Sequence, residues 1–149
     1  MFKSIDEIVA DQSLVSRKNL MLTFHSVIYE VDKSKYQPHL ETISLEKVIG
    51  TFKGEYPILP LGMLATQYFQ QNTVPYHNQI ELEKLLNANN IIAYPMVSEY
   101  KGFYYISGDG NHRLISGKLL SIKNAKALVF HLNKDDGDQV VDLIKNKKF

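Results

Sequence analysis

The sequence predicts a single α+β domain, and three observations indicate it. The chain has 149 residues, a length that one hydrophobic core can serve. Short runs rich in β-branched and aromatic residues lie close together at residues 91–100 and 102–108, and another follows at 125–132. Helix-like stretches occupy residues 78–86, 111–122 and 135–149. Helices and strands that do not alternate strictly along a chain are typical of an α+β layout.

Composition and charge limit the classes of function. Apolar residues make up 44% of the chain and charged residues 22%, which is ordinary for a globular protein. The net charge of +1 argues against attraction of the whole surface to nucleic acid or anionic membrane, although a local DNA-binding patch stays open. The absence of cysteine excludes disulfides, thiolate metal sites and a cysteine nucleophile, and it fits a cytoplasmic protein. We expect neither a signal peptide nor a membrane helix, because no apolar run approaches about 20 residues.

Residues 1–38 predict an N-terminal helical extension. Ser4 and Glu7 have the spacing of a capping box, which favours a short helix. From Leu20 onward, apolar residues at steps of three and four favour a second helix, and these residues are Phe24, Val27, Ile28 and Val31. A strand is the alternative for residues 22–31, because this stretch is rich in β-branched and aromatic side chains.

We expect the core of the domain at residues 40–132. A strand is predicted from Leu40 through Leu45 into Val48, Ile49 and Gly50, where the glycine ends it. Prolines 57, 60 and 75 predict irregular structure between residues 52 and 77, with at most one short helix at 61–71. We then expect, in this order, a helix at 78–86, a hairpin with its turn at residues 100–102, a helix after residue 111 and a strand at 125–132. A helix at 135–149 closes the chain, with acids in its first turn and lysines in its last.

The turn "GDGNHR", residues 108–113, carries the densest polar chemistry of the chain. Gly108 and Gly110 would allow unusual backbone angles and close approach of a ligand between a strand and a helix. The helix start offers backbone amides and a positive dipole end to an anion, and Arg113 and His112 add donors. Asp109 would cap the helix, hold Arg113, bind a divalent metal or accept a proton. A purely structural turn is the alternative, since glycine and aspartate are common there.

The run "IIAYPMVSEYKGFYYISGDGNHRLISGKLLSIKNAKALVFHL" resembles the ParB/sulfiredoxin-like superfamily. The resemblance rests on ordered motifs, which are Pro95 to Val97, Tyr105 to Arg113, Ser116 with Gly117, Ser121 with Ile122, and Leu128 to Leu132. Upstream, "ISLEKVIGT" is similar to the segment that opens the domain in ParB-like proteins. The resemblance covers roughly residues 40–132. It implies a small mixed sheet flanked by helices, and a turn that binds a nucleotide or another phosphate.

The resemblance also assigns roles. The phosphate- or nucleotide-binding residues would be Gly108, Gly110, Asn111, His112, Arg113, Thr51 and Lys53, the lysine standing where relatives often carry an arginine. Asp109 and His112 would be catalytic in phosphoryl transfer or phosphodiester hydrolysis, and Asp109 would hold Mg²⁺ with a nucleoside triphosphate. The closest motif match is to proteins described as ParB-like nucleases, of bacterial or phage type.

Two departures from the family narrow the expectation. With no cysteine, the sulfinic acid reduction of sulfiredoxins is excluded. The 17 residues after Leu132 are too few for the helix-turn-helix domain of partition proteins, so chromosome partition is not expected. The rival hypothesis is a non-catalytic regulatory protein of phage or plasmid type that binds DNA or a protein partner.

Overall fold

A computed structural model describes residues 2–11, 13–54, 56–68, 73–75, 79–89, 93–108 and 110–147. The described residues form a mixed α+β structure around a six-stranded sheet. The order across this sheet is β2 (His25–Ser26), β4 (Val48–Thr51), β7 (Phe103–Ile106), β6 (Met96–Tyr100), β8 (Asn124–His131) and β3 (His39–Ser44). The pairs β2–β4, β4–β7 and β6–β8 are parallel, whereas β6–β7 and β3–β8 are antiparallel. A separate antiparallel pair joins β1 (Phe2–Ser4) to β5 (Thr73–Pro75).

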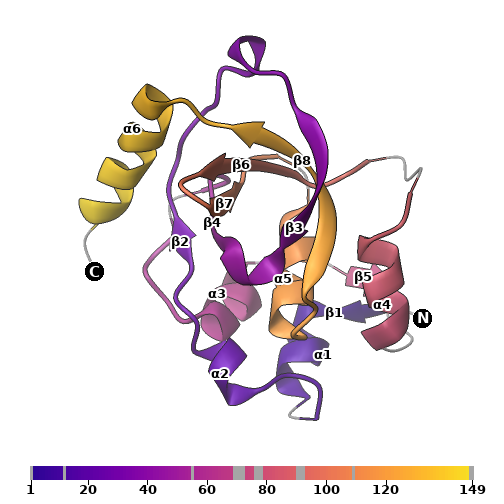
Figure 1. The fold of residues 1–149 in the computed structure, drawn as a ribbon. Coiled ribbons are helices and arrows are strands. Elements are labelled where there is room, and N and C mark those ends of the chain that lie inside the picture. Colours follow the sequence, from indigo (N-terminus) through magenta and orange to yellow (C-terminus); the bar gives the residue numbers. More distant parts are fainter. Residues whose placement is uncertain are drawn as a thin grey trace.

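The main core lies between one face of the sheet and most of the helices. These helices are α1 (Ile5–Ala10), α3 (Leu61–Tyr68), α4 (Gln79–Leu86) and α5 (Asn111–Leu119), and the short α2 (Arg17–Leu20) contacts α3 and α5. Ile8, Leu64, Leu82 and Leu114 are completely buried there with Val97 of the sheet. In Figure 1, α1, α2 and α3 lie in the lower part of the view, and α5 extends upward from them.

The opposite face carries a smaller core. α6 (Lys134–Lys145) and the chain from Val27 to Tyr36 cover it, with Val140 and Val31 packed in the same cluster as Phe52 and Tyr105. In Figure 1, α6 stands apart from the other helices. Asn133 caps α6, because its side chain accepts a hydrogen bond from the Asp136 amide. The sheet is therefore covered on both faces. Each face carries apolar side chains that must be buried against other elements.

The helix expected from Leu20 to Val31 is wrong. α2 ends at Leu20, β2 covers only two residues, and the chain then runs on without regular structure as far as Asp32. The backbone amide of Val27 donates to Thr51 O, so this stretch pairs beside β4 instead of bonding within a helix. Residues 1–38 are thus not a helical extension throughout, since their second half belongs to the sheet and the smaller core.

The strand expected from Leu40 to Gly50 is two strands. A 3-10 turn, η2 (Leu45–Lys47), divides it, and β3 and β4 lie in different parts of the sheet. Gly50 lies inside β4, which ends at Thr51. Apolar residues continue through the turn because Leu45 is buried in the main core, and the sequence pattern therefore shows no break.

The remaining predicted helices and strands are present, although some are shorter than predicted. The hairpin has a two-residue turn in which Lys101 and Gly102 both have positive φ, as type I′ turns require. Among the described residues of the proline-rich region, α3 is the only helix, and α4, β8 and α6 match their predicted stretches within a few residues. The predicted strand at 91–100 begins at Met96, and its residues 91 and 92 lie outside the described part. The β1–β5 pair was not predicted.

Candidate functional site

A cleft with a volume of about 1040 Å³ opens at one edge of the sheet. It lies where the parallel strands β4 and β7 end and where the antiparallel β6 begins. Three segments line it: residues 28–33, residues 52 and 53 after β4, and Ser107, Gly108, Gly110 and Asn111 after β7, with Met96 beside them. In sheets with parallel strands, ligands bind beyond the carboxyl ends of the strands, so this is the edge where a site is expected.

The predicted turn forms one wall of the cleft, and α5 begins in it. Gly110 is the N-cap of α5 and has φ 109°, a conformation that side-chain-bearing residues rarely adopt. A Cβ at Gly110 would lie 2.5 Å from Pro95 Cβ, and one at Gly108 would lie 2.9 Å from Met96 Cβ. Gly110 has no side chain to cap the helix, so the first-turn amides of α5 keep their donors directed beyond the helix end.

A buried hydrogen bond between Thr51 and Asn111 joins the end of β4 to the start of α5. The Thr51 hydroxyl donates to Asn111 Oδ1 at 2.6 Å, and the amide of Lys53 donates to Thr51 Oγ1 at 3.2 Å. Asn111 is 3% exposed and Thr51 is completely buried. This bond therefore links the end of β4 to the first turn of α5.

The other predicted site residues are placed differently. Lys53 is exposed and lines the cleft. Arg113 is not among the described residues that line it, and its Nη1 donates to Ala93 O at 2.7 Å. Asp109 lies outside the described residues. His112 belongs to α5, and nothing of its side chain is described. The structure thus brings together Gly108, Gly110, Asn111, Thr51 and Lys53.

The wall at residues 28–33 was missed as part of the site. Burial alternates along this stretch, because Val27, Tyr29 and Val31 pack in the smaller core while Ile28 and Glu30 are exposed. This two-residue period was present in the sequence, but the overlapping steps of three and four favoured a helix. Asp136 of α6 holds the wall in place, because its carboxylate accepts from Tyr29 at 2.5 Å and from the Tyr36 hydroxyl.

Charge in the cleft is mixed. Lys53 and Lys33 line it together with Glu30 and Asp32. Hydrogen bonds from the Ser34 hydroxyl and amide lower the pKa of Asp32, so this carboxylate stays ionised. The Ser107 hydroxyl is buried at the cleft and has no partner among the described residues. Within the described ranges, no group of three histidine, aspartate or glutamate side chains could hold a metal ion.

Comparisons with known proteins add no family. No protein-family model matches the chain, and no curated protein matches its sequence. In the part of the chain that the structure describes, no helix is long and apolar enough to cross a membrane.

Proposed function

We propose that the cleft binds a phosphate-containing ligand, most simply a nucleotide, at the turn of residues 108–113. The observation that carries the proposal is the start of α5 at Gly110, which opens onto the cleft without a side-chain cap. Backbone amides at a helix start, with the positive end of the helix dipole, favour an anion there. The ammonium of the exposed Lys53 lies in the same cleft as a further donor. The proposal agrees with the resemblance to the ParB/sulfiredoxin-like superfamily, whose fold we propose for this chain.

A nucleotide fits better than free phosphate because the cleft has two kinds of wall. The glycine turn is polar, whereas Ile28, Tyr29, Phe52 and Met96 supply apolar and aromatic surface. The ring of Phe52 stacks on Tyr105 with centroids 5.4 Å apart and meets Tyr29 edge-on at 5.5 Å, which fixes its position. A cleft of this volume is at the large end of ordinary ligand sites, so it has room for a base and ribose beside the phosphates.

The described acids of the cleft do not form a metal site of their own. Glu30 and Asp32 line the wall that faces the glycine turn, and Asp32 Oδ1 already accepts from Ser34. Phosphoryl transfer or hydrolysis stays a prediction, because the side chains of both candidate catalytic residues, Asp109 and His112, lie outside the described structure.

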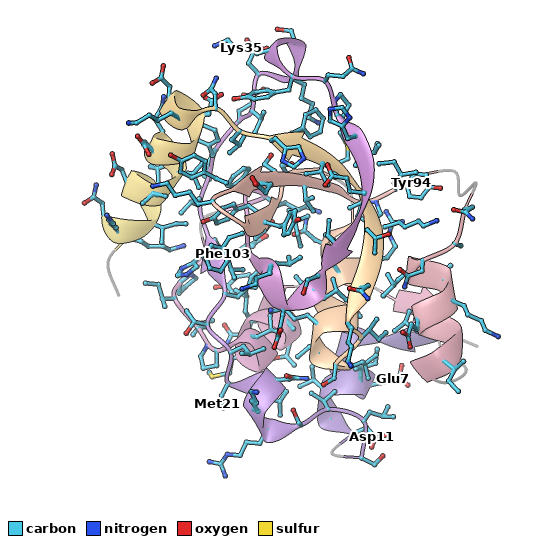
Figure 2. The ribbon with its side chains drawn as sticks, in the orientation of Figure 1. Glu7, Asp11, Met21, Lys35, Tyr94 and Phe103 are labelled. Atoms are coloured by element: carbon cyan, nitrogen blue, oxygen red, sulfur yellow. The ribbon has the colours of Figure 1, made fainter. Side chains whose placement is uncertain are left out.

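Calorimetric titration tests the proposal with ATP, CTP, GTP, ADP and pyrophosphate, each with and without Mg²⁺. We expect one nucleotide to bind more tightly than pyrophosphate. Lys53→Gln should weaken it at least about tenfold, because a charge-assisted contact to phosphate contributes about 1.5–3 kcal/mol. Lys35→Gln is the matched control, since Lys35 is exposed at the tip of the loop between β2 and β3 (Figure 2).

A second variant probes the glycine turn itself. Asn111→Asp keeps the shape and the oxygen that accepts from Thr51, but it places a negative charge at the start of α5. We expect it to weaken nucleotide binding more than Lys53→Gln does. No binding of any tested nucleotide, or equal binding by wild type and Asn111→Asp, would contradict the proposal and favour the interaction-protein hypothesis.

A further inference from the structure

A second pocket, with a volume of about 460 Å³, lies at the C-terminal end of α5. Its walls come from α2, from Ser44 to Glu46 at the start of η2, and from residues 118–124 between α5 and β8. In Figure 1 this region is at the bottom of the view, where α2 and the lower end of α5 meet. None of the described residues lines both this pocket and the cleft at the start of α5.

Lys118 carries a buried positive charge into this pocket. It is 7% exposed, and its Nζ donates to Leu45 O at 3.1 Å and to Glu46 O at 3.4 Å. An ammonium has three hydrogens, so these two carbonyls leave one donor. Within the described ranges, no carboxylate forms an ion pair with Lys118. Burial lowers the pKa of Lys118, and the nearby charge of Glu46 only partly opposes this effect.

A buried ammonium without a counter-ion is unusual, because buried charges in proteins are normally paired. Glu46, the one acid among the described lining residues, is exposed and forms no ion pair with Lys118. Lys18 and Lys123 add two exposed ammonium groups, so the described lining residues comprise three lysines and one acid, Glu46. An anion bound at Lys118 Nζ would provide the direct ion pair that Glu46 does not form.

The pocket has a defined shape. Asn19 Nδ2 donates to Leu119 O at 2.9 Å and to Ser121 Oγ at 2.6 Å, which joins α2 to the end of α5. The Leu45 amide donates to Lys123 O at 2.9 Å and closes the other side. Leu22, Leu45 and Ile122 give the lining an apolar part. The pocket thus combines one buried cation with an apolar wall.

We propose that this pocket binds a small organic acid, with its carboxylate on Lys118 Nζ and its apolar part against Leu22 and Ile122. A carboxylate fits better than a phosphate for two reasons. The C-terminal end of α5 presents the negative end of a helix dipole, which disfavours a dianion. Glu46 adds a negative charge at the same wall. The volume suits a ligand at the small end of the usual range.

Titrations of acetate, butyrate, hexanoate, butyramide and inorganic phosphate test the proposal, followed by the backbone amide signals of the protein in NMR spectra. Butyrate should shift the amides of residues 44–46 and 121–124 and leave those of Gly108, Gly110 and Asn111 unchanged. Butyramide has nearly the same shape without the charge, and we expect it to bind at least about tenfold more weakly. Affinity should rise from acetate to butyrate because the longer chain reaches the apolar wall.

Lys118→Met removes the charge and keeps the length of the side chain. It should weaken butyrate binding at least about tenfold, whereas Lys84→Met, an exposed lysine of α4, should leave it unchanged. If Lys118→Met does not fold, the comparison of butyrate with butyramide on wild type still decides the question. Equal binding of those two compounds, phosphate binding more tightly than every acid, or no binding at millimolar concentration would each overturn the proposal. None of these outcomes concerns the nucleotide cleft.

Discussion

At the residue scale, the bond between Thr51 and Asn111 connects positions 60 residues apart in the chain. The turn that contains Asn111 could be predicted from glycine, aspartate and helix-start chemistry. Thr51 could be proposed only from the resemblance of its segment, because no local spacing links a strand end to a distant helix. The role of Asn111 in the fold was hidden for the same reason, since its partner comes from another element.

Thr51→Val tests this bond. Valine has the shape of threonine but no hydroxyl, so Asn111 Oδ1 would stay buried without its donor and the Lys53 amide would lose its acceptor. We expect the free energy of unfolding to fall by about 1–3 kcal/mol, the cost of an unsatisfied buried acceptor. Urea denaturation measures the change.

Thr42→Val is the matched control, because Thr42 is exposed on the edge strand β3. Its effect should stay within about 0.5 kcal/mol. Similar losses for the two variants would mean that the Thr51–Asn111 bond contributes nothing beyond the ordinary effect of the substitution.

At the element scale, the prediction succeeded for elements whose burial follows one local period. In α4, α6, the hairpin and β8, the apolar residues follow a single helical or strand spacing. Residues 24–31 failed because Phe24 packs in the main core whereas Val27 and Val31 pack in the smaller one. A chain that passes from one core to the other mixes two patterns, and the mixture imitated helical spacing. The cleft wall was missed with it.

Asp136→Asn tests how α6 holds that wall. An asparagine keeps one acceptor oxygen, but its amide nitrogen cannot accept from the second tyrosine. We expect faster amide hydrogen exchange in residues 28–36 and a stability loss of about 0.5–1.5 kcal/mol. Hydrogen exchange followed by mass spectrometry localises the change.

Asp135→Asn is the comparison, since both acids lie in the first turn of α6 and both substitutions weaken the same interaction with the helix dipole. Asp135 is exposed, so exchange in the wall should stay at the wild-type rate. Acceleration by both variants would assign the effect to the helix start instead of the tyrosine bonds.

At the scale of the whole molecule, two histidines at distant points of the sheet respond to pH in opposite directions. His131 of β8 contacts Glu41 of β3 at 2.5 Å and Glu99 of β6 at 3.6 Å. The hydrogen bond to Glu41 raises the pKa of His131 above its usual value of 6.5. His25 of β2 is partly buried, and this burial, with a smaller effect of Lys147, lowers its pKa.

The direction in which each histidine changes the stability with pH follows from the linkage between protonation and folding. A raised pKa means that protonated His131 stabilises the fold fully below pH 6.5, and that this stabilisation is lost as pH rises through the folded-state pKa. A lowered pKa means that His25 contributes above pH 6.5, and that this contribution is lost as pH falls toward its folded-state pKa. The two effects together predict maximal stability near pH 6.5, with declines on both sides.

Replacement of His131 separates the loss of stability above pH 6.5 from the loss below it. We expect His131→Gln to remove most of the decline above pH 6.5, and Glu41→Gln to do the same because it removes the partner that raises the pKa. The decline below pH 6.5 should persist in both, since it belongs to His25. Thermal unfolding midpoints between pH 5 and 9 measure the profile. An unchanged alkaline limb in both variants would show that the bridge between the edge strand β3 and β8 contributes no pH-dependent stability, and β3 would then be held by its backbone pairing with β8.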